Sequence, residues 1–101
     1  DVTALFAIND FVAFIAVHIL QEYGYAVPED IAVVGFDNTF LAYEAQPQLT
    51  TIAQPIAEIT RLALDRLLER ISGTRHDAPA KIILEPTLIV RDSTRKTKIL
   101  S

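Results

Sequence analysis

The strongest constraint on the fold is a short apolar run at residues 31–34, in which three of the four side chains are β-branched. A run of this length and composition suits a strand buried on both faces, as in a parallel sheet between helices. Pro28 precedes the run and disfavours helical backbone at the residue before it. Gly35 follows, where the chain must turn sharply or pass close to another group. We therefore expect a buried strand that ends at Gly35.

Polar residues come directly after this predicted strand. Asp37 and Asn38 lie just past its carboxyl end, and ligands of open α/β sheets bind in the crevice outside the carboxyl ends of the strands. A carboxylate accepts several hydrogen bonds at once, which suits the hydroxyl or amine groups of a small molecule. Asp37 is therefore the first candidate for a ligand contact. The alternative is a structural role, as an Asx-turn or helix cap after Gly35.

Extended and helical patterns alternate along the chain. Asn9 or Asp10 is suited to cap the first helix, and Gly24 and Gly73 to end the first and the last helix. Such alternation predicts an α/β fold with parallel βαβ units and flanking helices. We expect extended segments at residues 2–8, 31–34, 49–53 and 81–90, helices at residues 11–20, 39–46 and 55–72, and a frayed tail from Arg91 onward.

Composition narrows the class of protein. Half of the 101 residues are hydrophobic, which is a large share because small domains have much surface to cover with polar groups. We therefore expect faces buried against a second subunit or a further part of the chain. The absence of cysteine excludes disulfides and thiolate metal sites. The net charge of −4 disfavours nucleic-acid binding by these residues alone. No apolar run reaches the about 20 residues of a membrane span, so we expect a cytoplasmic protein.

Five sequence blocks together resemble one known family. They are A-I-N-D at residues 7–10, P-E-D-I-A-V-V-G-F-D-N at 28–38, L-T-T-I-A-Q-P at 49–55, the helix end L-L-E-R-I-S-G within 63–73, and L-E-P-T-L-I-V-R-D-S-T at 84–94. Their order and spacing are similar to those of the lactose/galactose repressor (LacI/GalR) family of bacterial transcription regulators. The blocks cover nearly the whole chain, so the resemblance does not depend on any one of them.

The resemblance implies a two-lobed, periplasmic-binding-protein-like (type I) fold around a ligand cleft. Residues 1–49 and 88–93 would belong to the carboxy-terminal lobe, and the helix at residues 55–72 to the other lobe. The chain would then be the carboxy-terminal part of the effector-binding region, and the DNA-binding domain would be absent from it.

The resemblance also implies which residues contact a small-molecule effector, usually a sugar. Asp37 and Asn9 would do so, while the aspartate that matches Asp10 more often caps the helix in the family. Phe40 could stack on a sugar ring or pack in the core. Ile56 stands where some relatives place an aromatic residue at the cleft.

A homodimer is the third implication of the resemblance. In the family, the first helix and the short helix near residue 40 face a partner subunit across a two-fold axis, which makes the contact isologous. Exposed apolar patches of such size are rare on monomers. The predicted interface residues are Phe14, Leu41, Ala42, Tyr43 and Ala45.

We interpret the chain as the effector-sensing and dimerisation part of a DNA-binding transcription regulator that is not an enzyme. The alternative is a periplasmic sugar-binding protein of a transport system, which has the same fold. A metal site needs three or four convergent ligands, and His18 has only the distant His76 as a fellow histidine. We therefore expect neither a metal nor another cofactor. The basic residues near the end of the chain, Arg91, Arg95, Lys96 and Lys98, are interpreted as a solvated tail.

The isolated 101 residues should bind neither sugar nor operator DNA with useful affinity, because they hold one wall of the cleft and no DNA reader. Fluorescence anisotropy with labelled operator at physiological salt tests this. Specific operator binding by the isolated piece would contradict the predicted division into domains.

Overall fold

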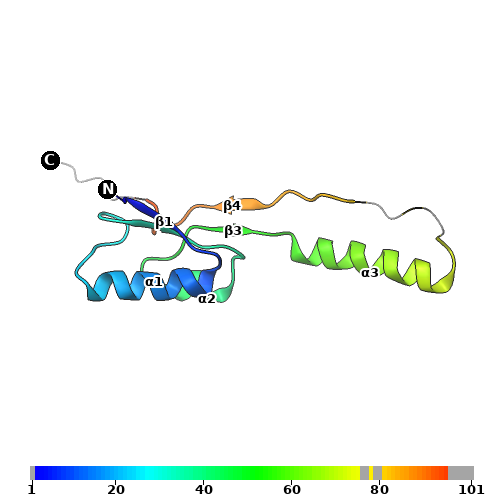
Figure 1. Ribbon diagram of the computed structural model, residues 1–101, viewed down its shortest axis with the longest axis horizontal. Coiled ribbons are helices and arrows are strands. Elements are labelled where there is room, and N and C mark those ends of the chain that lie inside the picture. The colour runs from blue at the N-terminus through cyan, green and yellow to red at the C-terminus, as the bar shows by residue number, and fades with distance from the viewer. Residues whose placement is uncertain (1, 76–77, 79–80, 96–101) are drawn as a thin grey trace. The chain divides into compact units, whose positions relative to one another are not determined.

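A computed structural model describes residues 2–75, 78 and 81–95, and the chain divides into two compact units (Figure 1). Unit 1 contains residues 1–53 and 87–101, and unit 2 contains residues 54–86. His76, Lys96 and Lys98 lie outside the described residues, so the expectations for them stay untested. None of the helices formed by the described residues is long and apolar enough to span a bilayer.

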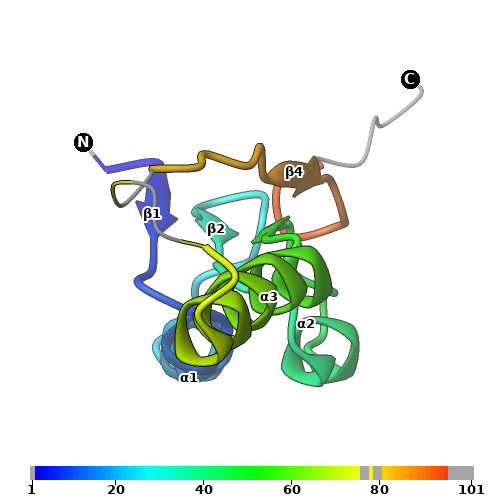
Figure 2. The ribbon, with the colours of Figure 1, turned by 90° about the vertical axis from the view of Figure 1, so that its right-hand side faces the viewer.

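Unit 1 begins with a parallel βαβ motif, as the alternating pattern predicts. Strand β1 (Ala4–Phe6) pairs in parallel with β2 (Ala32–Val34), with Leu5 opposite Val33. Helix α1 (Asp10–Glu22) connects the two strands and contacts both β2 and the short helix α2 (Phe40–Glu44). Both helices lie on the same side of β1 and β2 (Figures 1 and 2). The expected strand–helix order is therefore confirmed, with shorter strands than the sequence suggests.

The remaining strands of unit 1 depart from the all-parallel expectation. Strand β3 (Thr51–Ala53) pairs with β4 (Thr87–Ile89) in antiparallel register, with Ile52 opposite Leu88. The reason is the path of the chain, which enters unit 2 after β3 and returns from it through β4. A single parallel bridge between Val34 and Thr50 joins β2 to the start of this second pair.

Small and β-branched side chains form the core of unit 1. Val33 of β2 is fully buried, in agreement with the central-strand prediction. Helix α1 buries only one face, through Ala13 and Val17, although its sequence is apolar on nearly every side. The core cluster consists of Ala7, Ala13, Val17, Val27, Val33, Ala42, Ala45 and Leu49. Phe14 and Leu20 are half-buried against this core, whereas Phe11, Val12, Ile15 and Ile19 of α1 are exposed in the single chain.

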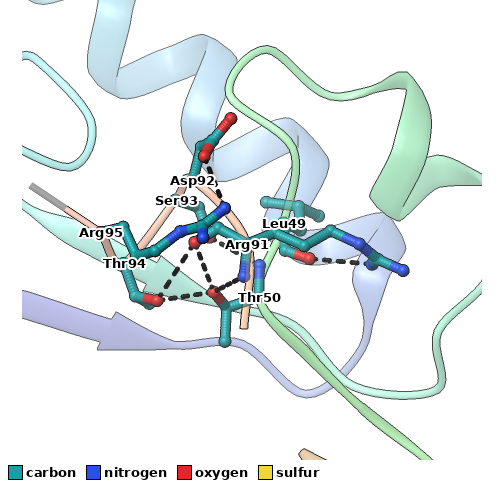
Figure 3. A network of polar contacts seen from close by, with 7 residues as sticks. All are labelled: Leu49, Thr50, Arg91, Asp92, Ser93, Thr94 and Arg95. Atoms are coloured by element: carbon teal, nitrogen blue, oxygen red, sulfur yellow. Dashed lines mark hydrogen bonds and ion pairs between the residues drawn. The ribbon is translucent and has the colours of Figure 1, made fainter. Parts of the chain in front are cut away.

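The expected frayed tail is wrong for residues 91–95. Ser93 is fully buried, its Oγ donates to the Val33 carbonyl over 2.5 Å, and its carbonyl accepts the Val33 N–H over 3.1 Å. The Thr50 N–H also donates to Ser93 Oγ, at 2.8 Å (Figure 3 shows these residues). The charged and polar residues of this segment suggested a tail exposed to solvent. Hydrogen bonds to buried residues of unit 1 hold the segment in place instead.

Unit 2 contains helix α3 (Ile56–Ser72). Pro55 was predicted in the first turn and stands instead at the N-cap, one residue before the helix begins. Gly73 ends the helix with a left-handed φ of 78°. A hollow of about 300 Å³ lies on the apolar side of the helix. Its lining residues are Ile59, Leu62, Ala63, Arg66, Ile82 and Leu84.

Gly35→Ala should destabilise unit 1 by about 1–3 kcal/mol, the usual cost of overpacking. A Cβ at this position would overlap the Asp10 carboxylate and lie 3.3 Å from Asp10 Cα. Thermal unfolding of the intact protein measures the effect. Gly24→Asn is the control, because no atom lies within 4 Å of the added Cβ and Asn tolerates the positive φ. Equal melting temperatures for the two variants would show that the close approach of Gly35 to Asp10 does not affect the stability of unit 1.

Candidate functional site

The turn between β2 and α2 has an unusual backbone conformation. Asp37 has a φ of 104° and Asn38 a φ of 56°, and Asp and Asn are among the few residues with side chains that tolerate positive φ. Such backbone costs about 1–3 kcal/mol per residue and persists only where surrounding contacts impose it. Strained turns of this kind cluster at functional sites, so the turn is the candidate site.

Strand β3 holds the backbone of this turn. The Asp37 N–H donates to the Ile52 carbonyl at 2.8 Å, and the Asn38 N–H donates to Thr51 Oγ1 at 3.3 Å. The Gly35 N–H donates to the Thr50 carbonyl at 2.8 Å. The turn therefore continues the alignment of β2 with β3 beyond the end of β2.

A buried carboxylate supports the turn from the side of α1. Asp10 is fully buried, and its Oδ2 accepts hydrogen bonds from the Thr39 N–H at 2.5 Å and from Thr39 Oγ1 at 3.1 Å. Its Oδ1 accepts from Thr51 Oγ1 at 2.6 Å. Both oxygens of Asp10 are thus engaged inside the protein. This geometry favours a structural role over the predicted ligand contact, which no observation tests directly.

Of the two residues predicted to cap the first helix, Asn9 is the one that does so, although the family resemblance favoured Asp10. The Val12 N–H donates to Asn9 Oδ1 at 2.8 Å, and Asn9 has extended backbone, as an N-cap residue does. Asp10 is the first residue of α1, and its N–H donates to the Phe36 carbonyl at 3.0 Å. The ends of β1 and β2 are therefore adjacent, as parallel pairing requires.

One edge of unit 1 thus brings together three of the predicted ligand residues. Asn9 follows β1 and is half-buried, Asp37 follows β2 and is exposed, and Phe40 begins α2 with 73% of its surface exposed. Phe36 is half-buried. Ile56 belongs to unit 2, where it is exposed, and its predicted place at a cleft stays a prediction.

Arg91 is the residue of this region that the sequence interpretation missed. It is 8% exposed, its Nη2 donates to Asn38 Oδ1 at 2.9 Å, and its Nη1 donates to the Leu49 carbonyl at 3.0 Å (Figure 3 shows the second bond). Its Cζ lies 4.2 Å from the centre of the Tyr43 ring, in cation–π geometry. An arginine at the end of the apolar run L-I-V was the available signal, because a charged side chain next to a strand is often buried with partners.

The predicted interface residues divide into two groups. Ala42 and Ala45 are fully buried in the core of unit 1, so their assignment to an exposed interface is corrected. They point inward because α2 is only five residues long and must bury one face against the core. Phe14 and Leu41 are half-buried, and Tyr43 is 55% exposed. These three residues remain candidates.

His18 makes local contacts on the surface of α1. Its Nδ1 lies 2.9 Å from the Phe14 carbonyl, and its ring lies 4.5 Å from the Phe14 ring, centre to centre. Within residues 2–75, 78 and 81–95, no three His, Cys, Asp or Glu side chains are grouped as metal ligands would be.

Comparisons with known proteins agree with this geometry. The periplasmic binding protein-like domain family matches residues 2–94. The HTH-type transcriptional regulator DegA of Bacillus subtilis is 45% identical over 92 residues, which are 91% of this chain and 27% of DegA. The chain therefore spans about a quarter of the length of this relative.

Solved structures of transcription regulators are also similar to this chain. The transcriptional regulator CelR in complex with cellobiose superposes with a TM-score of 0.87 at 39% identity, over 92% of this chain and 28% of CelR. A LacI family transcriptional regulator from Enterococcus faecium with bound ribose superposes with a TM-score of 0.80 at 38% identity. The match covers 91% of this chain and 34% of that protein. The predicted fold class is thus confirmed. The predicted resemblance to repressors agrees with the similar proteins, which are transcription regulators. The chain belongs to the periplasmic binding protein-like domain family.

Proposed function

We propose that this chain is the effector-binding and dimerisation part of a cytoplasmic transcription regulator, and that its effector is a sugar-like molecule. The observation that carries the proposal is the exposed carboxylate of Asp37, held on a left-handed turn at the carboxyl ends of two parallel strands. A carboxylate on a backbone held in this way can accept hydrogen bonds from two neighbouring hydroxyl groups.

The neighbours of Asp37 suit a sugar. Phe40 presents an exposed ring that can cover the apolar face of a sugar. Asn9 lies on the same edge, and its amide oxygen caps α1. Two similar structures hold a sugar, cellobiose in one and ribose in the other, which supports the same class of effector for this chain.

A transcription regulator is favoured over a transport protein of the same fold, because the similar proteins named above are transcription regulators. Operator DNA would then be bound only through a separate amino-terminal domain, and no catalytic step would be needed. Effector binding would act by favouring one arrangement of the lobes over another.

The proposed dimer uses the apolar residues that unit 1 leaves exposed. Ile15 and Ile19 of α1 are 41% and 44% exposed, and Tyr43 of α2 is 55% exposed. Helices α1 and α2 contact one another, so these side chains belong to one pair of helices. A self-complementary apolar surface of this kind is typical of stable homodimers.

Asp37→Asn should weaken sugar binding by the full-length regulator by about 1.5–3 kcal/mol, the value of a hydrogen bond to a charged group. The substitution removes the charge and keeps a residue that tolerates positive φ. Isothermal titration with cellobiose, ribose and a panel of other mono- and disaccharides measures the change.

Asp92→Asn is the matched control, because Asp92 is exposed and pairs only locally with Arg95 in a contact of 2.9 Å. It should leave the dissociation constant unchanged. If Asp37→Asn also leaves it unchanged for every sugar that binds, Asp37 is not in the effector site.

Ile15→Asp and Ile19→Asp should each weaken dimerisation, because a carboxylate would be buried without a partner at the interface. Sedimentation velocity of the full-length regulator at micromolar concentration measures the change. Tyr25→Asp is the control, since Tyr25 is 49% exposed and lies outside both helices. A parent protein that sediments as a monomer, or variants that sediment as the parent dimer, would contradict the proposed interface.

A further inference from the structure

The Arg91 side chain contacts three residues that precede it by more than forty positions in the sequence. Its guanidinium contacts the Leu49 carbonyl before β3, Asn38 in the turn after β2, and the Tyr43 ring on α2. Arg91 and Asn38 are 53 residues apart in the chain. The planar guanidinium suits this role, because it donates in fixed directions within its plane and stacks on an aromatic ring with its face.

The backbone of Arg91 is itself held firmly. The Arg91 N–H donates to Thr50 Oγ1 at 2.8 Å, and Thr50 Oγ1 donates to the Arg91 carbonyl at 3.0 Å. Thr50 Oγ1 also lies 2.6 Å from Thr94 Oγ1 (Figure 3). The guanidinium therefore extends from a fixed base toward Asn38, and its position is set by unit 1 rather than by solvent.

Asn38, a residue of the candidate turn, is held through both its backbone and its side chain. Its N–H donates to Thr51 Oγ1, and its side-chain oxygen accepts from Arg91. Its φ of 56° follows the φ of 104° at Asp37, so the two residues form one positive-φ turn. A bond that restrains Asn38 therefore also restrains the backbone next to Asp37.

We propose that Arg91 is a positioning residue for effector binding. Through its bond to Asn38 it keeps the left-handed turn in the conformation that presents the Asp37 carboxylate, and Tyr43 covers the face of the guanidinium and limits its movement. This inference rests on the proposed ligand contact of Asp37. It assigns to Arg91 no contact with the ligand.

The alternative is that Arg91 only contributes to the overall stability of unit 1. The two roles differ in where the effect of a substitution is seen. Arg91→Lys keeps the charge but cannot reproduce the planar pair of donors. Asn38→Gly removes the acceptor while glycine adopts a positive φ freely. Arg95→Lys is the control, because Arg95 is 62% exposed and pairs with Asp92.

Hydrogen–deuterium exchange of the full-length regulator tests the inference without any ligand. We expect Arg91→Lys and Asn38→Gly to raise the exchange rate of the segment at residues 36–40 about tenfold, with little change in α1, since local openings respond to local contacts. Arg95→Lys should change neither. No change at residues 36–40, or an equal increase throughout unit 1, would overturn the inference.

Sugar titration of the same variants provides the second measurement, with whichever of cellobiose, ribose and the other sugars binds the parent. Arg91→Lys should raise the dissociation constant about tenfold, and much less when Asp37→Asn is also present, because residues that act through one contact are not additive. An equal effect in both backgrounds would show that Arg91 does not act through Asp37. If Asp37→Asn alone has no effect, the proposed site fails, while the exchange measurement still decides whether Arg91 holds the turn.

Discussion

The buried carboxylate of Asp10 is the interaction on which the organisation of unit 1 depends. A carboxylate removed from water is tolerated only when hydrogen bonds replace its hydration. Here Thr39 supplies its N–H and its hydroxyl, and Thr51 supplies its hydroxyl. One side chain at the start of α1 therefore fixes the start of α2 and the first residue of β3. Gly35 leaves the space that the carboxylate occupies.

Two independent sets of contacts meet at the turn after β2. On one side, Asn38 N–H, Thr51 Oγ1 and the Asp10 carboxylate form a continuous chain of hydrogen bonds. On the other side, Arg91 reaches the Asn38 side chain from the segment that follows β4. The backbone of the turn is therefore held in one conformation before a ligand binds, and such preorganisation lowers the entropic cost of binding.

Much of this arrangement could be predicted from the sequence. The apolar run before Gly35 predicted the buried strand, and Gly73 predicted the end of the long helix. Asp37 was placed at the carboxyl end of β2, where the structure has it. The parallel expectation failed for β4, because apolar runs carry no information about which way the chain returns. Arg91 was placed in solvent, because its burial depends on acceptors more than forty residues away.

By itself, the sequence determined the order of strands and helices, the family and the edge on which polar residues follow the strands. These properties depend on local patterns, namely side-chain periodicity, glycine and proline, and short blocks of letters. Only the tertiary structure decided that Asn9 caps α1 while Asp10 is buried, that Ala42 and Ala45 face the core, and that Arg91 holds Asn38. The physical reason is that the burial of a polar group is stable only when distant segments supply its hydrogen-bond partners, and those partners are defined by the folded chain alone.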